Sequence, residues 1–284
     1  MTPASMSMAA RVRVLQPPIV DTHAHVFAKA LRLSRERRYT PDYDATLDTY
    51  LRHLAEHGIG HAVLVQPSFL GTDNAYLLQA LSREPRRLKG VAVLSHDVSD
   101  DALRRLHEQG VTGVRLNLVQ QPLPDLAAAA WGSLWRRLAE LGWHVELHRE
   151  ARDLVALVEE VASHGLCVVV DHFGRPDPQL GTEDPGFEGL LRLAASRQVW
   201  VKLSGAYRCA APGSGFVREA TRQLLAAFGG DRLMWGSDWP HTQFEQATDY
   251  AESVASLQRL GLDGATLDAV MRETPHAFYG FDTR

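Results

Sequence analysis

The chain contains 284 residues, of which 45% are hydrophobic and 23% are charged, and its formal net charge is −4 with 13 histidines counted as neutral. This length and apolar content suit one large core, as in α/β barrels of about 250 residues. The arginines are scattered rather than clustered, which excludes a basic surface for nucleic acid.

Three further features concern the compartment of the protein. No window approaches the ~18 uninterrupted apolar residues of a membrane span. Residues 1–10 lack the apolar stretch of a signal peptide. The two cysteines, Cys167 and Cys209, imply no disulfide framework. We therefore expect a cytoplasmic protein with no membrane or nucleic-acid partner, and the sequence leaves a homo-oligomer open.

Short apolar runs alternate with helical segments along the whole chain. The predicted strands span residues 19–26, 61–67, 88–94, 112–118, 143–148, 166–171, 199–204 and 232–238. The helices predicted after the first seven strands end near residues 57, 84, 109, 141, 164, 197 and 228, and two more span 245–260 and 266–278. The polar segment 27–42 is too irregular for a helix, and long loops of this kind are often functional.

Eight strand–helix alternations without a break in composition predict a closed parallel sheet, the (β/α)8 TIM barrel of the α/β class. Residues 18–284 would form this single catalytic domain, and residues 1–17 a flexible N-terminal extension. In such barrels the active site lies at the carboxyl ends of the strands. The residues at those ends are therefore the first candidates for a functional site.

Histidines and a carboxylate stand at four of these strand ends. One residue separates His23 from His25, so alternation along a strand places both side chains on the same face. His148 ends the fifth predicted strand, His172 follows the sixth, and Asp238 ends the eighth. Five titratable groups at one mouth indicate a functional site rather than scattered surface histidines.

Three arginines accompany these groups. Arg115 lies in the fourth strand, Arg175 follows the sixth, and Arg208 follows the seventh. A guanidinium matches a carboxylate through two parallel hydrogen bonds, so these residues predict a small anionic substrate. The alternative is pairing within the protein, of Arg115 with Glu146 or Asp171 and of Arg175 with Asp177.

Six motifs make the chain resemble the amidohydrolase superfamily, and within it the branch of 2-pyrone-4,6-dicarboxylate lactonase and related lactone hydrolases. They are Asp21-Thr22-His23-Ala24-His25, Arg38-Tyr39-Thr40-Pro41, Gly71-Thr72-Asp73-Asn74, Gly113-Val114-Arg115-Leu116-Asn117, Val170-Asp171-His172-Phe173-Gly174-Arg175-Pro176 and Trp235-Gly236-Ser237-Asp238-Trp239-Pro240-His241. The resemblance covers nearly the whole chain. It implies a (β/α)8 barrel that hydrolyses a carboxylated lactone, with a pyrone dicarboxylate, a muconolactone or a sugar-acid lactone all open as the substrate.

By position, the resemblance also implies roles for individual residues. Asp238 would be the general base that activates water. His23, His25 and His172 would surround the lactone carbonyl. The residues implied to bind substrate oxygens are Tyr39, Ser68, Arg115 and Arg208, with Arg175 beside His172.

Two positions depart from the pyrone dicarboxylate enzyme. Gln120-Gln121 stands where that enzyme carries a second arginine, which removes one carboxylate anchor. His148 stands where it carries a tyrosine. That enzyme resembles a metal-independent member, whereas others bind one divalent metal through a His-x-His pair, a strand-five histidine and the strand-eight aspartate. This chain has all four ligands (His23, His25, His148 and Asp238), so we predict a bound divalent metal, zinc, with a metal-free mechanism as the alternative.

Two other interpretations of the same residues stay open. A metal-dependent decarboxylase or hydratase, acting on a carboxylic acid from the degradation of aromatic compounds, would use the same histidines and is the main alternative. The other is a non-catalytic barrel that binds a ligand, although a binding module has no need of so many titratable groups at one mouth. The sequence does not identify the substrate ring.

Overall fold

The computed structural model describes residues 16–211 and 213–282, so all but two residues of the predicted N-terminal extension lie outside it. Eight parallel strands form one sheet in the order β1 to β8. The strands are β1 Ile19–Ala24, β2 Ile59–Val65, β3 Leu88–Ala92, β4 Val111–Asn117, β5 His144–His148, β6 Val168–Val170, β7 Val199–Leu203 and β8 Leu233–Trp235. A parallel bridge between Ala24 and Trp239 joins the first strand to the segment after the last.

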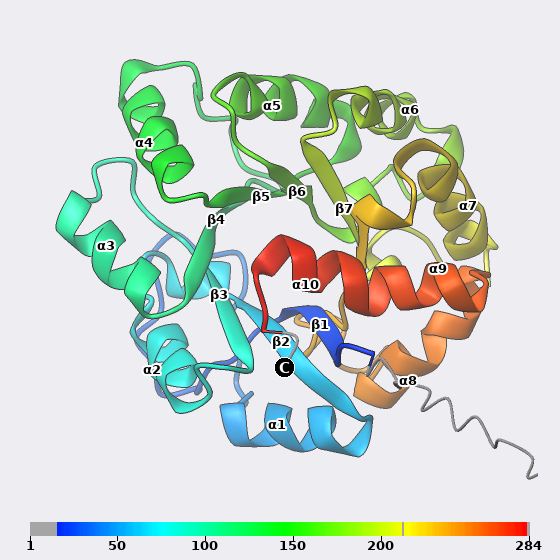
Figure 1. Cartoon of the computed structure of the whole chain (residues 1–284), viewed down its shortest axis with the longest axis horizontal. Coiled ribbons are helices and arrows are strands. Elements are labelled where there is room, and N and C mark those ends of the chain that lie inside the picture. Colours follow the sequence, from blue (N-terminus) through cyan, green and yellow to red (C-terminus); the bar gives the residue numbers. More distant parts are fainter. Residues whose placement is uncertain (1–15, 212, 283–284) are drawn as a thin grey trace, which may run out of the picture.

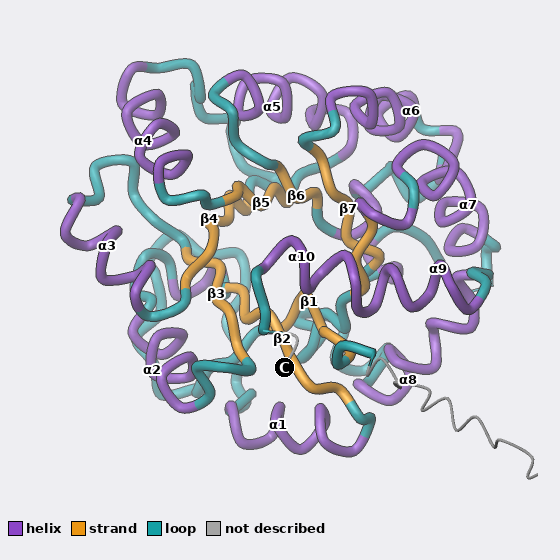
Figure 2. The backbone as a smooth tube through the Cα atoms, viewed as in Figure 1, coloured by secondary structure: helices purple, strands orange, loops and turns teal. Residues whose placement is uncertain are grey.

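The described residues form ten α-helices, most of which surround this ring of strands, whereas α10 lies across one end of it (Figure 1 and Figure 2). They are α1 Leu47–Glu56, α2 Ala75–Arg83, α3 Asp100–Glu108, α4 Ala129–Glu140, α5 Ala151–Ser163, α6 Pro185–Arg192, α7 Phe216–Phe228, α8 Tyr250–Ala255, α9 Gly264–Asp268 and α10 Thr274–Tyr279. The predicted (β/α)8 barrel is confirmed. None of these helices has the length and apolarity needed to cross a bilayer.

One predicted helix begins later than the sequence suggested. The helix expected from residue 245 begins as α8 at Tyr250, where the Asp249 side chain accepts a hydrogen bond from the backbone of Glu252. Glu245 instead accepts hydrogen bonds from Tyr39 (2.5 Å) and Tyr43 (2.8 Å). These contacts hold residues 241–249 as a loop over the mouth of the barrel.

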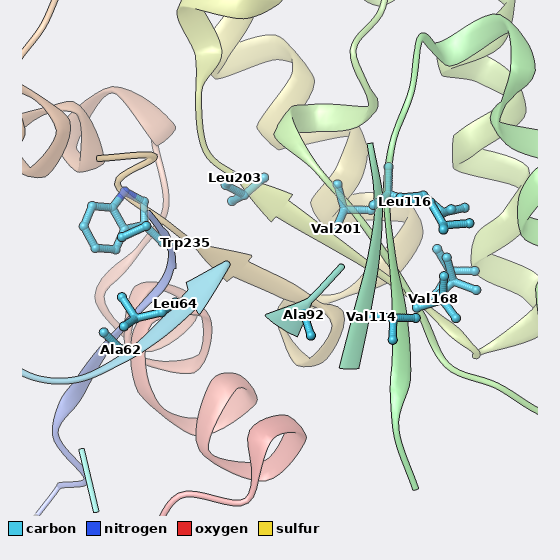
Figure 3. Packing of buried hydrophobic residues seen from close by; sticks show 14 of the residues in the cluster. Ala62, Leu64, Ala92, Val114, Leu116, Val168, Val201, Leu203 and Trp235 are labelled. Atoms are coloured by element: carbon cyan, nitrogen blue, oxygen red, sulfur yellow. The ribbon is translucent and has the colours of Figure 1, made fainter. Parts of the chain in front are cut away.

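Alternating side chains of the strands divide the core into two layers. In β2, Ala62 and Leu64 pack outward against the helices, whereas Val63 and Val65 point into the barrel, as the two-residue period of a strand requires. Figure 3 shows the outward layer, to which other strands add residues such as Trp235. The barrel interior is apolar near the amino ends of the strands, and α10 closes that end with Tyr279.

Asp21 fixes the position of the His-x-His segment. Its carboxylate accepts hydrogen bonds from the backbone of Ser237 (2.8 Å) and from the hydroxyls of Tyr50 (2.8 Å) and Tyr250 (3.1 Å). The β1–β2 pairing is irregular between Asp21 and Ala24. This irregularity lets Asp21 face the helices while His23, two residues later, faces the barrel interior.

Candidate active site

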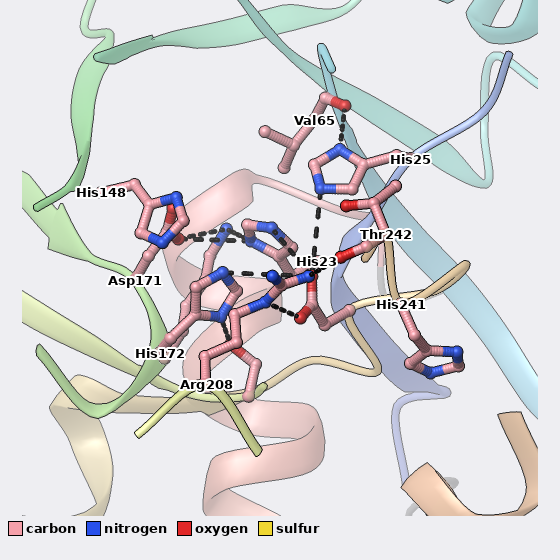
Figure 4. Close-up of polar contacts among 12 residues, drawn as sticks. His23, His25, Val65, His148, Asp171, His172, Arg208, His241 and Thr242 are labelled. Carbon is pink, nitrogen blue, oxygen red and sulfur yellow. Dashed lines mark hydrogen bonds and ion pairs between the residues drawn. The ribbon is translucent and has the colours of Figure 1, made fainter. Parts of the chain in front are cut away.

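Four buried side chains converge at the carboxyl end of the barrel. The Oδ1 atom of Asp238 lies 3.9 Å from Nε2 of His23, 4.0 Å from Nε2 of His25 and 3.9 Å from Nε2 of His172. Figure 4 shows His23, His25 and His172 grouped together, with His241 turned away. Oδ1 of Asp238 and Nε2 of His23 are buried without a hydrogen-bond partner among the described residues. The three imidazoles and the carboxylate therefore face one shared space.

The other oxygen of Asp238 is firmly held. Oδ2 accepts hydrogen bonds from the hydroxyl of Tyr207 and from Nε of Arg208, both at 2.6 Å. Burial raises the pKa of Asp238, but the positive charge of Arg208 and the hydrogen bond that it donates outweigh burial and hold this pKa well below its usual range. Asp238 is thus an oriented carboxylate at neutral pH, with Oδ1 directed at the shared space.

Each imidazole of this cluster has a different partner on its Nδ1 atom. Nδ1 of His25 lies 2.7 Å from the carbonyl oxygen of Val65, and Nδ1 of His172 lies 2.9 Å from Oγ of Ser204. Nδ1 of His23 lies 3.1 Å from Nζ of Lys202. Burial lowers the pKa of His25 to about 4 and that of His172 to about 3, so both rings are neutral at neutral pH.

The predicted arginines divide into two kinds. Arg115 donates to Asp171 from Nη2 (2.8 Å) and Nε (3.0 Å) and lies 3.4 Å from Glu146, so the pairing alternative describes it. Nη1 of Arg175 lies 3.2 Å from Nε2 of His148. Arg175 forms no ion pair with Asp177 or with any other described carboxylate. Arg115 and Arg208 are therefore neutralised within the protein, whereas Arg175 is not.

All of the predicted substrate-binding residues line one pocket beside this cluster. Its lining also contains residues to which the sequence gave no role, and the full set is His25, Arg38, Tyr39, Pro67, Ser68, Phe69, Arg115, Asn117, His148, His172, Arg175, Arg208, Asp238, Thr242 and Gln243. Arg38 stands at the rim, where Nη2 donates to Oδ1 of Asn117 at 2.8 Å. Partial burial, followed by the charges of Arg115 and Arg175, lowers the pKa of Arg38. Arg38 and Arg175, which form no ion pair among the described residues, thus give the pocket a net positive charge.

The donor set at its base fits a divalent metal ion. His23, His25 and Asp238 each offer a ligand atom, and these atoms lie within 4.8 Å of one another. Neutral imidazoles and a carboxylate are common ligands for such ions. The structure does not bring the fourth predicted ligand into this group, because Nδ1 of His148 lies 3.1 Å from Arg115 and its Nε2 faces Arg175.

A layer of buried charged residues lies beneath the cluster, and the sequence did not predict that these residues form one group. It consists of Arg115, Glu146, Asp171 and Lys202, which come from β4, β5, the end of β6 and β7. Nζ of Lys202 lies 2.5 Å from Oε2 of Glu146, and both side chains are fully buried. The sequence contained a signal, because Lys202 and Glu146 are charged residues inside otherwise apolar strands. Tyr207, in contrast, carried no such signal.

The fold and the site agree with the relatives of this sequence. Residues 20–281 match the sequence model of the amidohydrolase family, and the chain belongs to that family. It is therefore a hydrolase of the amidohydrolase type, as the motifs predicted.

Three similar proteins refine the comparison. A 2-pyrone-4,6-dicarboxylate hydrolase of Comamonas testosteroni is 34% identical over 78% of this chain and 76% of its own. A 4-sulfomuconolactone hydrolase of Hydrogenophaga intermedia is 31% identical over 81% and 77%. A solved structure from Pseudomonas putida, assigned as a 2-pyrone-4,6-dicarboxylic acid hydrolase, is 47% identical over 95% of this chain and 100% of its own, with a TM-score of 0.90.

Proposed function

We propose that this chain opens an anionic lactone by hydrolysis of its ring ester. The observation that carries the proposal is Oδ1 of Asp238, which has no hydrogen-bond partner in the described part of the chain. It faces three imidazoles at nearly equal distances, beside a pocket lined with arginines. The names of the relatives support the same reaction, because both curated relatives hydrolyse lactones that carry acidic groups.

The chemistry needs a base, a water molecule and support for negative charge on the carbonyl oxygen. Oδ1 of Asp238 accepts a proton from water, and the oxygen of that water bonds to the ring carbonyl carbon. The C–O bond of the ring ester then breaks, and the leaving oxygen takes up a proton. Imidazole N–H groups at hydrogen-bond distance stabilise the oxyanion, and each such donor is typically worth about 3 kcal/mol.

The charges of the pocket suggest how the substrate is held. Arg115 and Arg208 already pair with carboxylates of the protein, whereas Arg38 and Arg175 have no ion-pair partner among the described residues. We assign the main anionic substituents of the substrate to Arg38 and Arg175, with Tyr39 and Ser68 of the pocket wall contacting neutral oxygens. Arg38 thus takes over the role of the anchor that Gln120-Gln121 cannot provide.

For the metal ion, we propose a smaller set of ligands than the four predicted from the sequence. His23, His25 and Asp238 would hold a zinc ion, which acts as a Lewis acid on a carbonyl and lowers the pKa of bound water. His148 is the weakest member of the predicted set, because the guanidinium groups of Arg115 and Arg175 face both of its ring nitrogens and repel a further cation. His172 has the same distance to Asp238 as His23, so it remains beside the carbonyl in either case.

A panel of lactones tests the function. Pyrone dicarboxylates, sulfonated and carboxylated muconolactones and sugar-acid lactones are followed by proton release, each beside its neutral methyl ester. We expect turnover of at least one anionic lactone and a loss of about tenfold or more for the ester. Each assay is run as purified, with added zinc and after chelation. Release of carbon dioxide from an acid, with no lactone hydrolysed, would instead establish the decarboxylase alternative.

A further inference from the structure

The two histidines of the His-x-His segment do not offer the same group to the site. Nδ1 of His25 lies 2.7 Å from the carbonyl oxygen of Val65, and a carbonyl only accepts hydrogen bonds. Nδ1 of His25 must therefore carry the proton. In a neutral imidazole the other nitrogen is then bare, so Nε2 of His25 presents a lone pair to Asp238 and the shared space.

His23 has the opposite kind of neighbour. Nδ1 of His23 lies 3.1 Å from Nζ of Lys202, which also contacts Oε2 of Glu146 at 2.5 Å and lies 3.8 Å from Oδ1 of Asp171. The head group of lysine is an ammonium in its ordinary form. An ammonium has three N–H donors and no lone pair, so towards His23 it only donates.

A competing arrangement also exists. Oδ1 of Asp171 lies 3.2 Å from Nδ1 of His23, and Oε1 of Glu146 lies 3.4 Å away, so either could accept a proton placed on Nδ1. Neither oxygen accepts a hydrogen bond from the described residues in the present arrangement. The contact between Lys202 and His23, by contrast, meets hydrogen-bond geometry.

We propose that Lys202 is a positioning residue that fixes His23 as the tautomer with its proton on Nε2. His23 then donates a hydrogen bond into the space that it shares with Asp238, while His25 offers a lone pair there. Combined with the proposed function, on which this step rests, His23 stabilises the oxyanion of the ring carbonyl in the metal-free site. His25 accepts a hydrogen bond from the water that Asp238 activates.

The same tautomer sets the affinity for a metal ion. A metal on Nε2 of His23 needs the lone pair of that atom, which moves the ring proton to Nδ1, against the ammonium of Lys202. Lys202 therefore lowers the affinity of the His23, His25 and Asp238 set for a metal ion without removing any of its ligands. Removal of the ammonium frees Nδ1 of His23 to donate to Asp171 and leaves Nε2 available as a ligand.

Two variants separate this role from simple structural support. Lys202→Met removes the donor, while Glu146→Gln breaks the same buried ion pair but leaves Nζ against His23. The ring nitrogens of histidine-labelled protein are observed by long-range ¹H–¹⁵N correlation, and His23→Gln assigns the signals of His23. Zinc affinity is measured by competition with a chelating dye.

We expect the wild type and Glu146→Gln to carry the proton of His23 on Nε2, and Lys202→Met to carry it on Nδ1. Lys202→Met should bind zinc about tenfold more tightly and lose about 10²-fold in kcat with little change in KM. A wild-type His23 with its proton on Nδ1 would overturn the inference, and that spectrum needs no folded Lys202 variant. If no lactone is hydrolysed but the tautomers are as expected, the proposed function fails while the role of Lys202 stands.

Discussion

The two ends of the barrel both bury histidine, but in opposite surroundings. At the amino end, the His144 ring packs against Phe278 and Tyr279, with ring centroids 5.1 Å and 5.5 Å apart. Gly113 on the neighbouring strand makes room, because a Cβ there would lie 2.4 Å from the His144 ring. At the carboxyl end, His23, His25 and His172 surround a carboxylate rather than aromatic rings.

Because of this difference, the amino end of the barrel contributes mainly to stability and the carboxyl end mainly to activity. Aromatic and apolar packing under α10 removes surface from water, and that burial stabilises the fold. The carboxyl end instead buries Oδ1 of Asp238 and Nε2 of His23 without hydrogen-bond partners among residues 16–211 and 213–282, an arrangement that costs free energy of folding. Such unfavourable burial persists where a ligand or a reacting group completes the site. The comparison predicts that changes at one end affect kcat and changes at the other end affect Tm.

The largest effect is expected for Asp238→Asn. The amide cannot accept the proton of water, so kcat should fall by about 10³-fold. Isothermal calorimetry should still detect binding of the lactone, because Arg38 and Arg175 remain. Activity within a few fold of the wild type would remove Asp238 from the role of base. The carboxyl end would then lack the residue that most directly links it to activity.

At the amino end, Tyr279→Ala should lower the free energy of unfolding by about 3 kcal/mol, because it opens a cavity beneath α10. Its kcat should be unchanged at temperatures where the variant is folded. Tyr279→Phe is the matched control, because the Tyr279 hydroxyl is buried without a partner in the described part of the chain. Denaturant unfolding should find this control as stable as the wild type. A kcat that fell in step with stability would show that the two ends are coupled.

Arg38→Met should have a smaller effect, confined to binding. Loss of the partly buried guanidinium at the rim should raise KM about tenfold for a doubly charged lactone and leave kcat nearly unchanged. Arg37→Met is the control, because Arg37 donates to Oγ of Thr40 and to the carbonyl of Ser34 and does not line the pocket. Equal KM values for the two variants would place the anion elsewhere.

The smallest effect per residue is expected from pH. Burial lowers the pKa of His144 to about 3, and those of His25 and His172 to about 4 and about 3, from an unfolded value of 6.5. Below pH 6.5 the unfolded chain binds protons that the folded protein excludes, so stability is highest above pH 6.5 and falls towards pH 4. Each histidine should contribute about 1 kcal/mol of this loss between pH 7 and 5.5.

His144→Gln isolates the contribution of the amino end to the pH dependence of stability, because glutamine does not titrate. Denaturant unfolding at several pH values should give a shallower dependence for this variant, with the activity of the wild type preserved. A stability that did not fall between pH 7 and 5.5 would contradict the neutral, buried state of these rings.

Much of the fold was readable from local patterns. The uninterrupted apolar run over residues 62–65 predicts a buried strand, and Gly58 after α1 marks the end of a helix. The helix expected from residue 245 failed because Glu245 accepts hydrogen bonds from two tyrosines some 200 residues earlier, at sequence separations of 206 and 202. No local pattern reports such contacts.

The site was predictable in position and only in part in its pairing, since the alternative that pairs Arg115 with Glu146 or Asp171 came from the sequence. The strand-end motifs placed His23, His25, His172 and Asp238 at one mouth, because parallel strands in a barrel end on the same face. They did not reveal that Arg208 pairs with Asp238, or that Arg38 remains without an ion-pair partner among the described residues. The residues next in sequence to an arginine do not determine which carboxylate it meets.

The sequence by itself therefore determined the barrel and the titratable groups at its mouth, since both follow from periodicity and from the order of strands. Only the tertiary structure decided which nitrogen of each histidine faces the site. Lys202 lies 179 residues from His23 in sequence, and β7 brings its ammonium against Nδ1 of that ring. Tautomers and ion pairs depend on distances of a few ångströms between strands far apart in the chain, and folding alone sets those distances.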